Sequence, residues 1–211
     1  VAPSSASRRN SAIASVTAAL NAISGMATNV QALRQDANTQ LVADVSRVNG
    51  LISRIYELNK SIKVAIATGD RASAFLDQRD NAVAELSKFL DIRTFEQGDG
   101  RVFVSLGDGT SLITDMSSEL RYLGPTAVSA STSVPSLNLQ RTDPEGGNDL
   151  GPAVALEGRI RGGEIRGLLD MRDKALPDLA EQLGLVGSAL VEQLNAVHND
   201  SAAVPAPSSL T

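Results

Sequence analysis

Residues 45–59 have the sequence VSRVNGLISRIYELN, in which apolar residues recur at Val45, Val48, Ile52 and Ile55. Steps of three and four residues place such side chains on one face of an α-helix. The same stripe continues in both directions, through Ile13, Val16, Leu20, Ile23, Ala27, Val30, Ala37, Leu41, Ile62 and Ile66. Polar residues, Arg34 and Asn59, occupy two of its positions. The stripe predicts one very long helix with a heptad-like apolar face.

Residues 4–124 contain no proline, which permits long helices throughout the first half of the chain. Gly25 and Gly50 lie inside the stripe, but a single glycine costs only about 1 kcal/mol relative to alanine and does not end a helix. Gly69 is suited to the position just after a helix. We therefore expect the long helix to end near residue 68 and a second helix to run from about Ser73 to Leu90.

After the second helix the apolar period changes to two. Residues 92–96 (IRTFE) and 101–106 (RVFVSL) alternate, and they are joined by Gln97-Gly-Asp-Gly. An Asp-Gly pair between alternating segments predicts a β-hairpin. A second turn at Gly107-Asp-Gly leads to another short run. Further strands are predicted near residues 111–114, 119–123, 136–140 and 153–156.

Residues 125–152 are rich in Ser, Thr, Pro and Gly, which predicts a surface excursion. Another long helix is then expected from about Ile165 to Asn199, with a kink or restart at Pro177. Its apolar stripe consists of Leu169, Leu176, Leu179, Leu183, Val186, Leu190, Leu194 and Val197. We expect the Val45–Ile55 stripe to pack against this returning helix around Leu183, Leu190 and Leu194.

These elements predict a mainly α fold with a smaller β part: a long antiparallel helical rod or bundle carrying a small antiparallel β-hairpin domain. Residues 1–93 form the long helix and the second helix. Residues 94–160 form the β elaboration with its Ser-, Pro- and Gly-rich loop. Residues 161–200 form the returning helix, and residues 201–211 a linker or truncated edge.

Composition excludes several classes of function. The net charge is −5, and no cluster of Lys and Arg is available to bind nucleic acid. The chain has no cysteine, so disulfides and thiolate metal sites are excluded. We expect no stretch apolar enough to cross a bilayer, and no cleavable signal peptide. The first 40 residues carry few charges; either neighbouring subunits cover their faces, or the helix is simply exposed and weakly charged.

The residues that could act in catalysis or metal binding are better explained by structural roles. His198 is the only histidine, and a lone histidine near a helix end does not make a zinc site. Asp77 with Asp80, and Asp170 with Asp173, are spaced to share a helix face, but each pair has an Arg beside it that repels a cation. We expect ion pairing rather than metal binding or acid–base catalysis.

The glycine-rich turns also lack a ligand-binding pattern. Gly98-Asp-Gly and Gly107-Asp-Gly do not have the alternating carboxylates and distal Glu of a calcium loop. The stretch 158–163, Gly-Arg-Ile-Arg-Gly-Gly, does not end in the Gly-Lys-Ser/Thr of a phosphate loop. We therefore predict no catalytic, cofactor or metal site.

The chain contains one internal similarity. Residues 75–86 and 168–179 share Leu, Asp, Arg, Asp, Ala and Leu at the same offsets, and we expect both segments to begin helices. Acidic residues in a first turn complement the helix dipole. We expect Arg79 or Arg172 to reach a carboxylate of a neighbouring helix.

These two segments, in their setting, resemble the flagellar hook-associated protein 1 family. The long helix ending in Ile55-Tyr-Glu-Leu-Asn-Lys-Ser-Ile is followed by Phe75-Leu-Asp-Gln-Arg-Asp. The similarity continues through Gly100-Arg-Val-Phe-Val-Ser-Leu-Gly and then Gly162-Gly-Glu-Ile-Arg-Gly-Leu-Leu-Asp-Met-Arg-Asp. It closes with the helix from Leu183 to His198. It covers most of residues 10–200 in the family's order, and the doubled Leu-Asp-x-Arg-Asp block is its most specific part.

The resemblance implies a structural subunit of the bacterial flagellum, located outside the cell at the hook–filament junction, with no enzymatic activity and no cofactor. Subunits of this family self-associate into a ring at the distal end of the hook. They contact the hook protein and hook-associated protein 3, and they leave the cell through type III export, with a chaperone bound to their C-terminus. Neither nucleic acid nor a membrane is an expected partner.

The chain departs from the family pattern in two places. The Gly-Asp-Asn-Gly-like stretch expected after the histidine is replaced by Asn199-Asp-Ser-Ala-Ala-Val-Pro. The chain also opens at Val1 without a methionine, so we expect a central fragment that lacks both coiled termini and the outer domain.

Two alternatives stay open: a hook-associated protein 3 or flagellin-like axial protein, and an unrelated helical signalling or adhesin module. An enzyme is a distant third, with no catalytic partners to name.

Overall fold

The computed structural model describes residues 6–129, 132, 134–143 and 147–202. The chain divides into two compact units, residues 1–33 with 175–211 and residues 34–174. We call the first the helix-pair unit and the second the mixed unit. The division predicted from the sequence, at residues 93, 160 and 200, stays a prediction, and from residue 203 onward the predicted linker lies outside the described residues.

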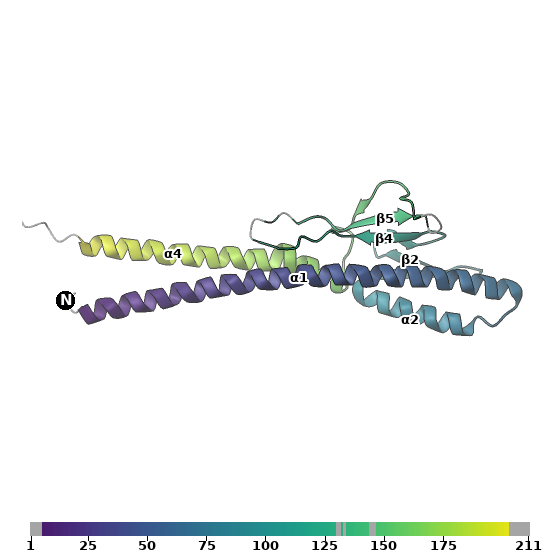
Figure 1. The fold of residues 1–211 in the computed structure, drawn as a ribbon, viewed down its shortest axis with the longest axis horizontal. Helices are drawn as coiled ribbons and strands as arrows, with labels where there is room; N and C mark the ends of the chain where they lie inside the picture. Colours follow the sequence, from purple (N-terminus) through teal and green to yellow (C-terminus); the bar gives the residue numbers. More distant parts are fainter. Residues whose placement is uncertain (1–5, 130–131, 133, 144–146, 203–211) are drawn as a thin grey trace, which may run out of the picture. The chain divides into compact units, whose positions relative to one another are not determined.

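Helix α1 (Ala6–Thr68) is the long helix that the stripe predicts, and it contributes to both units. It ends just before Gly69, whose φ of +76° is in the left-handed region that glycine adopts freely. Helix α2 (Ser73–Phe89) follows after a short turn, close to the predicted bounds. In Figure 1, α2 and the sheet both lie along the C-terminal half of α1.

The β part is a single six-stranded antiparallel sheet in the order β1-β2-β3-β4-β5-β6. Each strand pairs only with its neighbours in sequence, so the predicted hairpin is the first part of a longer meander. The strands are β1 (Ile92–Glu96), β2 (Val102–Leu106), β3 (Ser111–Ile113), β4 (Ser117–Arg121), β5 (Asn138–Thr142) and β6 (Val154–Ala155). Strand β3 is only three residues long, which leaves parts of β2 and β4 without a strand between them.

Two glycines of the mixed unit permit close approaches of the backbone. Gly100, in the β1–β2 turn, has φ +84°, and a Cβ there would lie 2.3 Å from Cδ1 of Ile66 on α1. Gly163 has φ +86°, and a Cβ would lie 2.4 Å from the carbonyl oxygen of Phe89. A side chain at either position therefore meets both backbone strain and a steric clash.

The returning helix has three parts: α3 (Glu164–Asp170), a π-helical turn η1 (Met171–Ala175) and α4 (Leu176–Ala202). The sequence predicted a kink or restart at Pro177. Proline has no N–H, and its ring crowds the carbonyl four residues earlier, here that of Asp173. The wider π turn just before Pro177 accommodates this, so the helix continues through the irregularity.

The main hydrophobic core lies within the mixed unit. Val45, Val48, Ile52 and Ile55 of α1 are buried in one cluster with side chains of α2, the sheet and α3. The cluster also contains Leu41, Leu51, Ala82, Leu86, Phe89, Leu90, Val102, Val104, Leu106, Leu112, Ile113, Leu120, Tyr122, Leu137, Leu139, Leu156, Ile160, Ile165 and Leu169. The predicted mainly α fold with a smaller antiparallel β part is confirmed.

The predicted partner of the Val45–Ile55 stripe was wrong. That stripe packs on α2, the sheet and α3, and the returning segment enters its cluster through Ile165 and Leu169. Leu183 lies instead beside α1 residues of the helix-pair unit. Three and four residue spacing shows that a helix face is buried, but it does not identify the element that covers the face.

The expectation that no segment is apolar enough to cross a bilayer was too strong. Among the described residues, one helix, α1, is long and apolar enough to cross a membrane by length and composition alone. An 18-residue window within residues 10–68 has a mean hydropathy of 1.2. A single such helix is weak evidence for a membrane span, because helices of soluble proteins pass the same test.

Candidate interaction surfaces and the buried polar contacts behind them

The two Leu-Asp-x-Arg-Asp blocks place buried arginines at equivalent positions. The Arg79 and Arg172 residues are 3% and 2% exposed. Each guanidinium binds the aspartate that follows it, Asp80 at 3.0 Å and Asp173 at 2.6 Å. The predicted ion pairing is thus present, but its partner is the next residue of the same chain segment and not a carboxylate of a neighbouring helix.

The third guanidinium nitrogen of each arginine, Nη1, bonds to the sheet region of the mixed unit. Nη1 of Arg79 donates to the carbonyl oxygen of Gly100 in the β1–β2 turn, at 2.7 Å. Nη1 of Arg172 donates to the Tyr122 hydroxyl after β4, also at 2.7 Å. Both blocks therefore fasten the sheet to the helices through one buried guanidinium each.

Tyr122 lies at the centre of a buried polar network. Its hydroxyl donates to Oδ1 of Asn38 on α1, and its ring lies 5.2 Å from the Arg172 guanidinium. Burial raises the pKa of the Tyr122 hydroxyl. Arg34, one of the two polar residues within the apolar stripe, donates through Nε to the carbonyl oxygen of Arg172 at 2.9 Å. Its Nη1 donates to the carbonyl oxygen of Ser129 at 2.7 Å.

The other polar residue of the stripe, Asn59, fills a gap in the sheet. Its amide nitrogen donates to the carbonyl oxygen of Val102 (2.7 Å), and the Val102 N–H donates to its Oδ1 (3.0 Å). Asn49 makes the same pair of bonds with Leu120, both at 2.8 Å. Because β3 is too short to reach Val102 or Leu120, these amides replace the missing strand. Sequence reasoning missed both contacts; the polar residue inside the apolar stripe was the only signal.

Asp44 is a buried carboxylate that the fold does not fully satisfy. Its side chain has no exposed surface, and Gln40 donates to Oδ1 at 2.9 Å. Within the described part of the chain, Oδ2 has no hydrogen-bond partner. Burial, reinforced by the nearby charge of Glu164, raises the pKa of the Asp44 carboxyl above its ordinary 3.8.

We expect Asp44→Asn to stabilise the protein by about 1 kcal/mol at neutral pH, because a neutral amide avoids the burial of an incompletely paired charge. A carboxyl with a raised folded pKa favours folding while protonated, and this benefit is lost as pH rises from 3.8 through the folded pKa. The melting-temperature advantage of the variant should therefore grow as the pH rises above about 4, through the raised folded pKa of Asp44. Asp36→Asn, on the exposed face of the same helix, is the control. An advantage that is independent of pH would contradict the assignment.

The acidic residues singled out in the sequence are placed as follows in the described part of the chain. No group of three or more His, Cys, Asp and Glu side chains is placed to hold a metal ion. Asp77 is exposed, and Asp170 pairs with Arg166 at 2.6 Å. The side chain of His198 lies outside the described residues.

The glycine-rich turns are held by local turn contacts. Asp99 accepts a bond from the Arg101 side chain at 2.7 Å. Asp108 accepts from the Thr110 backbone N–H at 2.9 Å and from Arg159 at 3.1 Å. The bond from Thr110 lowers the pKa of the Asp108 carboxyl. These contacts account for both Asp-Gly turns.

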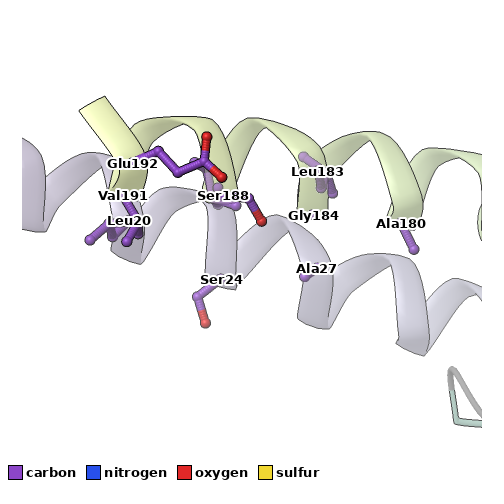
Figure 2. Close-up of a pocket in the computed structure, with 11 residues that line it drawn as sticks. Leu20, Ser24, Ala27, Ala180, Leu183, Gly184, Ser188, Val191 and Glu192 are labelled. Atoms are coloured by element: carbon purple, nitrogen blue, oxygen red, sulfur yellow. The ribbon is translucent and has the colours of Figure 1, made fainter. Parts of the chain in front are cut away.

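The helix-pair unit offers a different kind of candidate surface. Among its described side chains only Val30 and Leu176 are buried, so most of its apolar residues are partly or fully accessible. An open groove of about 580 Å³ lies between the two helices (Figure 2). Its lining comes from Leu20, Ile23, Ser24 and Ala27 of α1 and from Ala180, Leu183, Gly184, Gly187, Ser188, Val191 and Glu192 of α4. Apart from the carboxylate of Glu192, these side chains are small or apolar, as is common on surfaces that contact other proteins.

Comparisons with known proteins agree with the family that the sequence resembles. The model of the flagellar hook-associated protein FlgK helical domain matches residues 1–204. Flagellar hook-associated protein 1 of Salmonella typhimurium and that of Escherichia coli K12 are each 28% identical over 166 residues, which is 78% of this chain. The flagellar hook junction protein FlgK from Burkholderia pseudomallei superposes with a TM-score of 0.66 at 29% identity, over 85% of this chain.

The chain corresponds to only part of these relatives. It spans 29% of the length of the two curated proteins and 31% of the solved chain. Within that part, the match covers both units described above and includes both Leu-Asp-x-Arg-Asp blocks. The chain therefore belongs to the family of the helical domain of the flagellar hook-associated protein FlgK.

Proposed function

We propose that this chain is the helical section of a hook-associated protein 1 that forms the junction between the flagellar hook and the filament, outside the bacterial cell. The observation that carries the proposal is the family match over residues 1–204. The accessible apolar surface of the helix-pair unit supports it, because a subunit of an assembly needs such surface for its neighbours.

The role that we propose is structural and not enzymatic. The polar cluster around Tyr122 and Arg172 is buried: the Tyr122 hydroxyl donates to Asn38, and the Arg172 guanidinium donates to the Tyr122 hydroxyl and to Asp173. Such contacts fix the position of the sheet on the helices. The proposed partners are further copies of the subunit in a ring, the hook protein and hook-associated protein 3. Export through the flagellar type III system, assisted by a chaperone at the C-terminus, is part of the same proposal.

We expect deletion of the parent gene to leave cells that build hooks but shed filament subunits into the medium. Electron microscopy of the cells and immunoblotting of the medium measure the two outcomes. A strain without the filament gene is the matched control, because it has bare hooks but no shed subunits. Reintroducing the intact gene should restore filaments. Normal filaments in the deletion strain would overturn the proposed function.

Immunogold labelling separates this function from its alternatives. A junction protein is labelled at one point between hook and filament, whereas a flagellin-like protein is labelled along the whole filament. A signalling or adhesin module would be labelled on the cell body, and the isolated chain would form a parallel coiled-coil dimer. We expect the isolated chain to be largely monomeric by light scattering.

A further inference from the structure

Asn49 and Gly50, in the interior of helix α1, form a pair with a specific covalent reactivity. The backbone nitrogen that follows an asparagine can attack the carbon of the side-chain amide. Glycine allows the closest approach of that nitrogen, because it has no Cβ and the widest choice of backbone angles. Asn49 is the only asparagine of the chain that is followed by glycine. The pair is therefore a candidate site of covalent modification.

Packing does not account for the glycine at residue 50. Gly50 is exposed, and a Cβ there would meet nothing within 4 Å. Apart from proline, glycine is the least favourable residue in a helix interior. Alanine would fit the same place and give a more stable helix. The residue that makes Asn49 reactive is thus one that the fold itself does not require.

The fold holds both reacting groups in unreactive positions. The Asn49 amide donates to the carbonyl oxygen of Leu120, and its Oδ1 accepts from the Leu120 N–H, both at 2.8 Å. Inside an α-helix, the N–H of residue 50 is directed to the carbonyl oxygen of residue 46 and not to the side chain of residue 49. Attack requires the loss of this helical turn and of both bonds to Leu120. Unfolding removes all of them together.

We propose that Asn49-Gly50 is a deamidation site that is reactive in the unfolded chain and is protected by folding. The Gly50 nitrogen forms a bond to Cγ of Asn49, and the bond from Cγ to the amide nitrogen breaks. That nitrogen leaves as ammonia and takes the proton of the Gly50 N–H. Water then opens the imide ring. Cleavage at Cγ leaves aspartate, whereas cleavage at the backbone carbonyl carbon leaves isoaspartate, in which the chain runs through Cγ.

Both products lose the native contact with Leu120. Aspartate keeps an acceptor for the Leu120 N–H but places a second acceptor against the Leu120 carbonyl oxygen. Isoaspartate also adds a carbon atom to the backbone of α1, between core residues Val48 and Ile52. A chain that stays unfolded for long therefore becomes less able to refold. The inference goes beyond the proposed function, because it concerns the chain before any assembly.

Peptide mass spectrometry of the full-length protein tests the site. One sample is kept in guanidinium chloride at mildly alkaline pH, and another in the same buffer without denaturant. Trypsin then releases residues 48–54, which contain Asn49, and a sample taken at the start corrects for conversion during digestion. We expect this peptide to change from amide to acid in denaturant. In the folded protein the change should be at least about a hundredfold slower, because it requires opening of the structure.

Asn59 is the internal control. It makes the same pair of contacts with Val102, but Lys60 follows it, and trypsin releases it in residues 55–60. This peptide should stay unchanged over the time in which the 48–54 peptide converts. The two Asp-Gly turns do not interfere. Their imides form by loss of water, and hydrolysis restores the original mass.

Gly50→Ala tests the attacking group. In denaturant we expect it to slow the conversion of Asn49 roughly tenfold, because a Cβ restricts the approach of the nitrogen. The folded protein tolerates the change, since the new Cβ meets nothing. Gly25→Ala is the matched control: Gly25 is exposed on the same helix, also has open space around its Cβ, and follows Ser24. It should leave the rate unchanged.

Removal of the denaturant from the converted chain tests the consequence. We expect its refolded fraction, followed by circular dichroism, to be at least about twofold below that of an unaged sample. Gly50→Ala aged in the same way should refold like fresh protein. Equal conversion with and without denaturant would show that folding does not protect the site. No conversion in denaturant, an unchanged rate in Gly50→Ala, or complete refolding of the converted chain would each overturn the proposal.

Discussion

Ile52→Ala should lower the free energy of unfolding of the mixed unit by about 2–5 kcal/mol, because it removes a buried side chain and leaves a cavity. Ile52 is 1% exposed and belongs to the cluster formed by α1, α2, the sheet and α3. Close packing on several sides limits how far the neighbours can collapse into the space. The expected loss is therefore well above that of a surface substitution.

Urea denaturation followed by tyrosine fluorescence measures the unfolding free energy of the mixed unit. The chain has no tryptophan, and its two tyrosines, Tyr56 and Tyr122, both lie in the mixed unit. Ile13→Ala is the matched control, since Ile13 lies on the same helix, in the helix-pair unit, and is 65% exposed. A loss below about 0.5 kcal/mol for Ile52→Ala would mean that this face of α1 is not buried.

Asn59→Leu should cost about 2–4 kcal/mol, although it makes the apolar stripe of α1 more regular. The substitution removes both partners of Val102, so a buried N–H and a buried C=O lose their hydrogen bonds. Leucine cannot replace them, and β3 is too short to supply a strand neighbour. The same tyrosine signal reports the change. Asn29→Leu, at an exposed position of α1, is the control and should change stability by less than about 0.5 kcal/mol.

Asn59→Asp separates the loss of the hydrogen bonds from the change in side-chain shape. A carboxylate keeps an acceptor for the Val102 N–H but places a second acceptor against the Val102 carbonyl oxygen. Burial raises the pKa of such a carboxyl, and the protonated form can donate again. The deficit of this variant should therefore shrink as pH falls, which circular dichroism melts can follow. A pH-independent deficit would show that the donor to Val102 is not what stabilises the sheet.

The sequence predicted the elements well because their signals are local. The apolar steps of α1, the glycine after Thr68 and the Asp-Gly turn between β1 and β2 each act over a few residues. Packing was harder to predict. The spacing of apolar residues such as Val48 shows that one face of α1 is buried, but it does not show which elements pack on that face. The Asn49 and Asn59 contacts were also beyond reach, because they depend on the length of β3.

The candidate surface could be predicted only in part. Low charge in the first 40 residues indicated either cover by neighbours or simple exposure, and the sequence alone left both open. The groove between α1 and α4 depends on the register of the two helices, in which Gly187 lies next to Ile23. The buried arginine pairs were expected as ion pairs, but their bonds to Gly100 and Tyr122 depend on the sheet being in place.

The neighbour-to-neighbour order of the six strands has a consequence for how quickly the chain folds. Every strand finds its partner within the next stretch of polypeptide, so closing each successive loop costs little entropy. A sheet whose strands pair with their sequence neighbours forms faster than one that must join distant strands. A chain that regains its structure from the extended state can add β1 to β6 one after another, with no strand waiting for a partner from the far end.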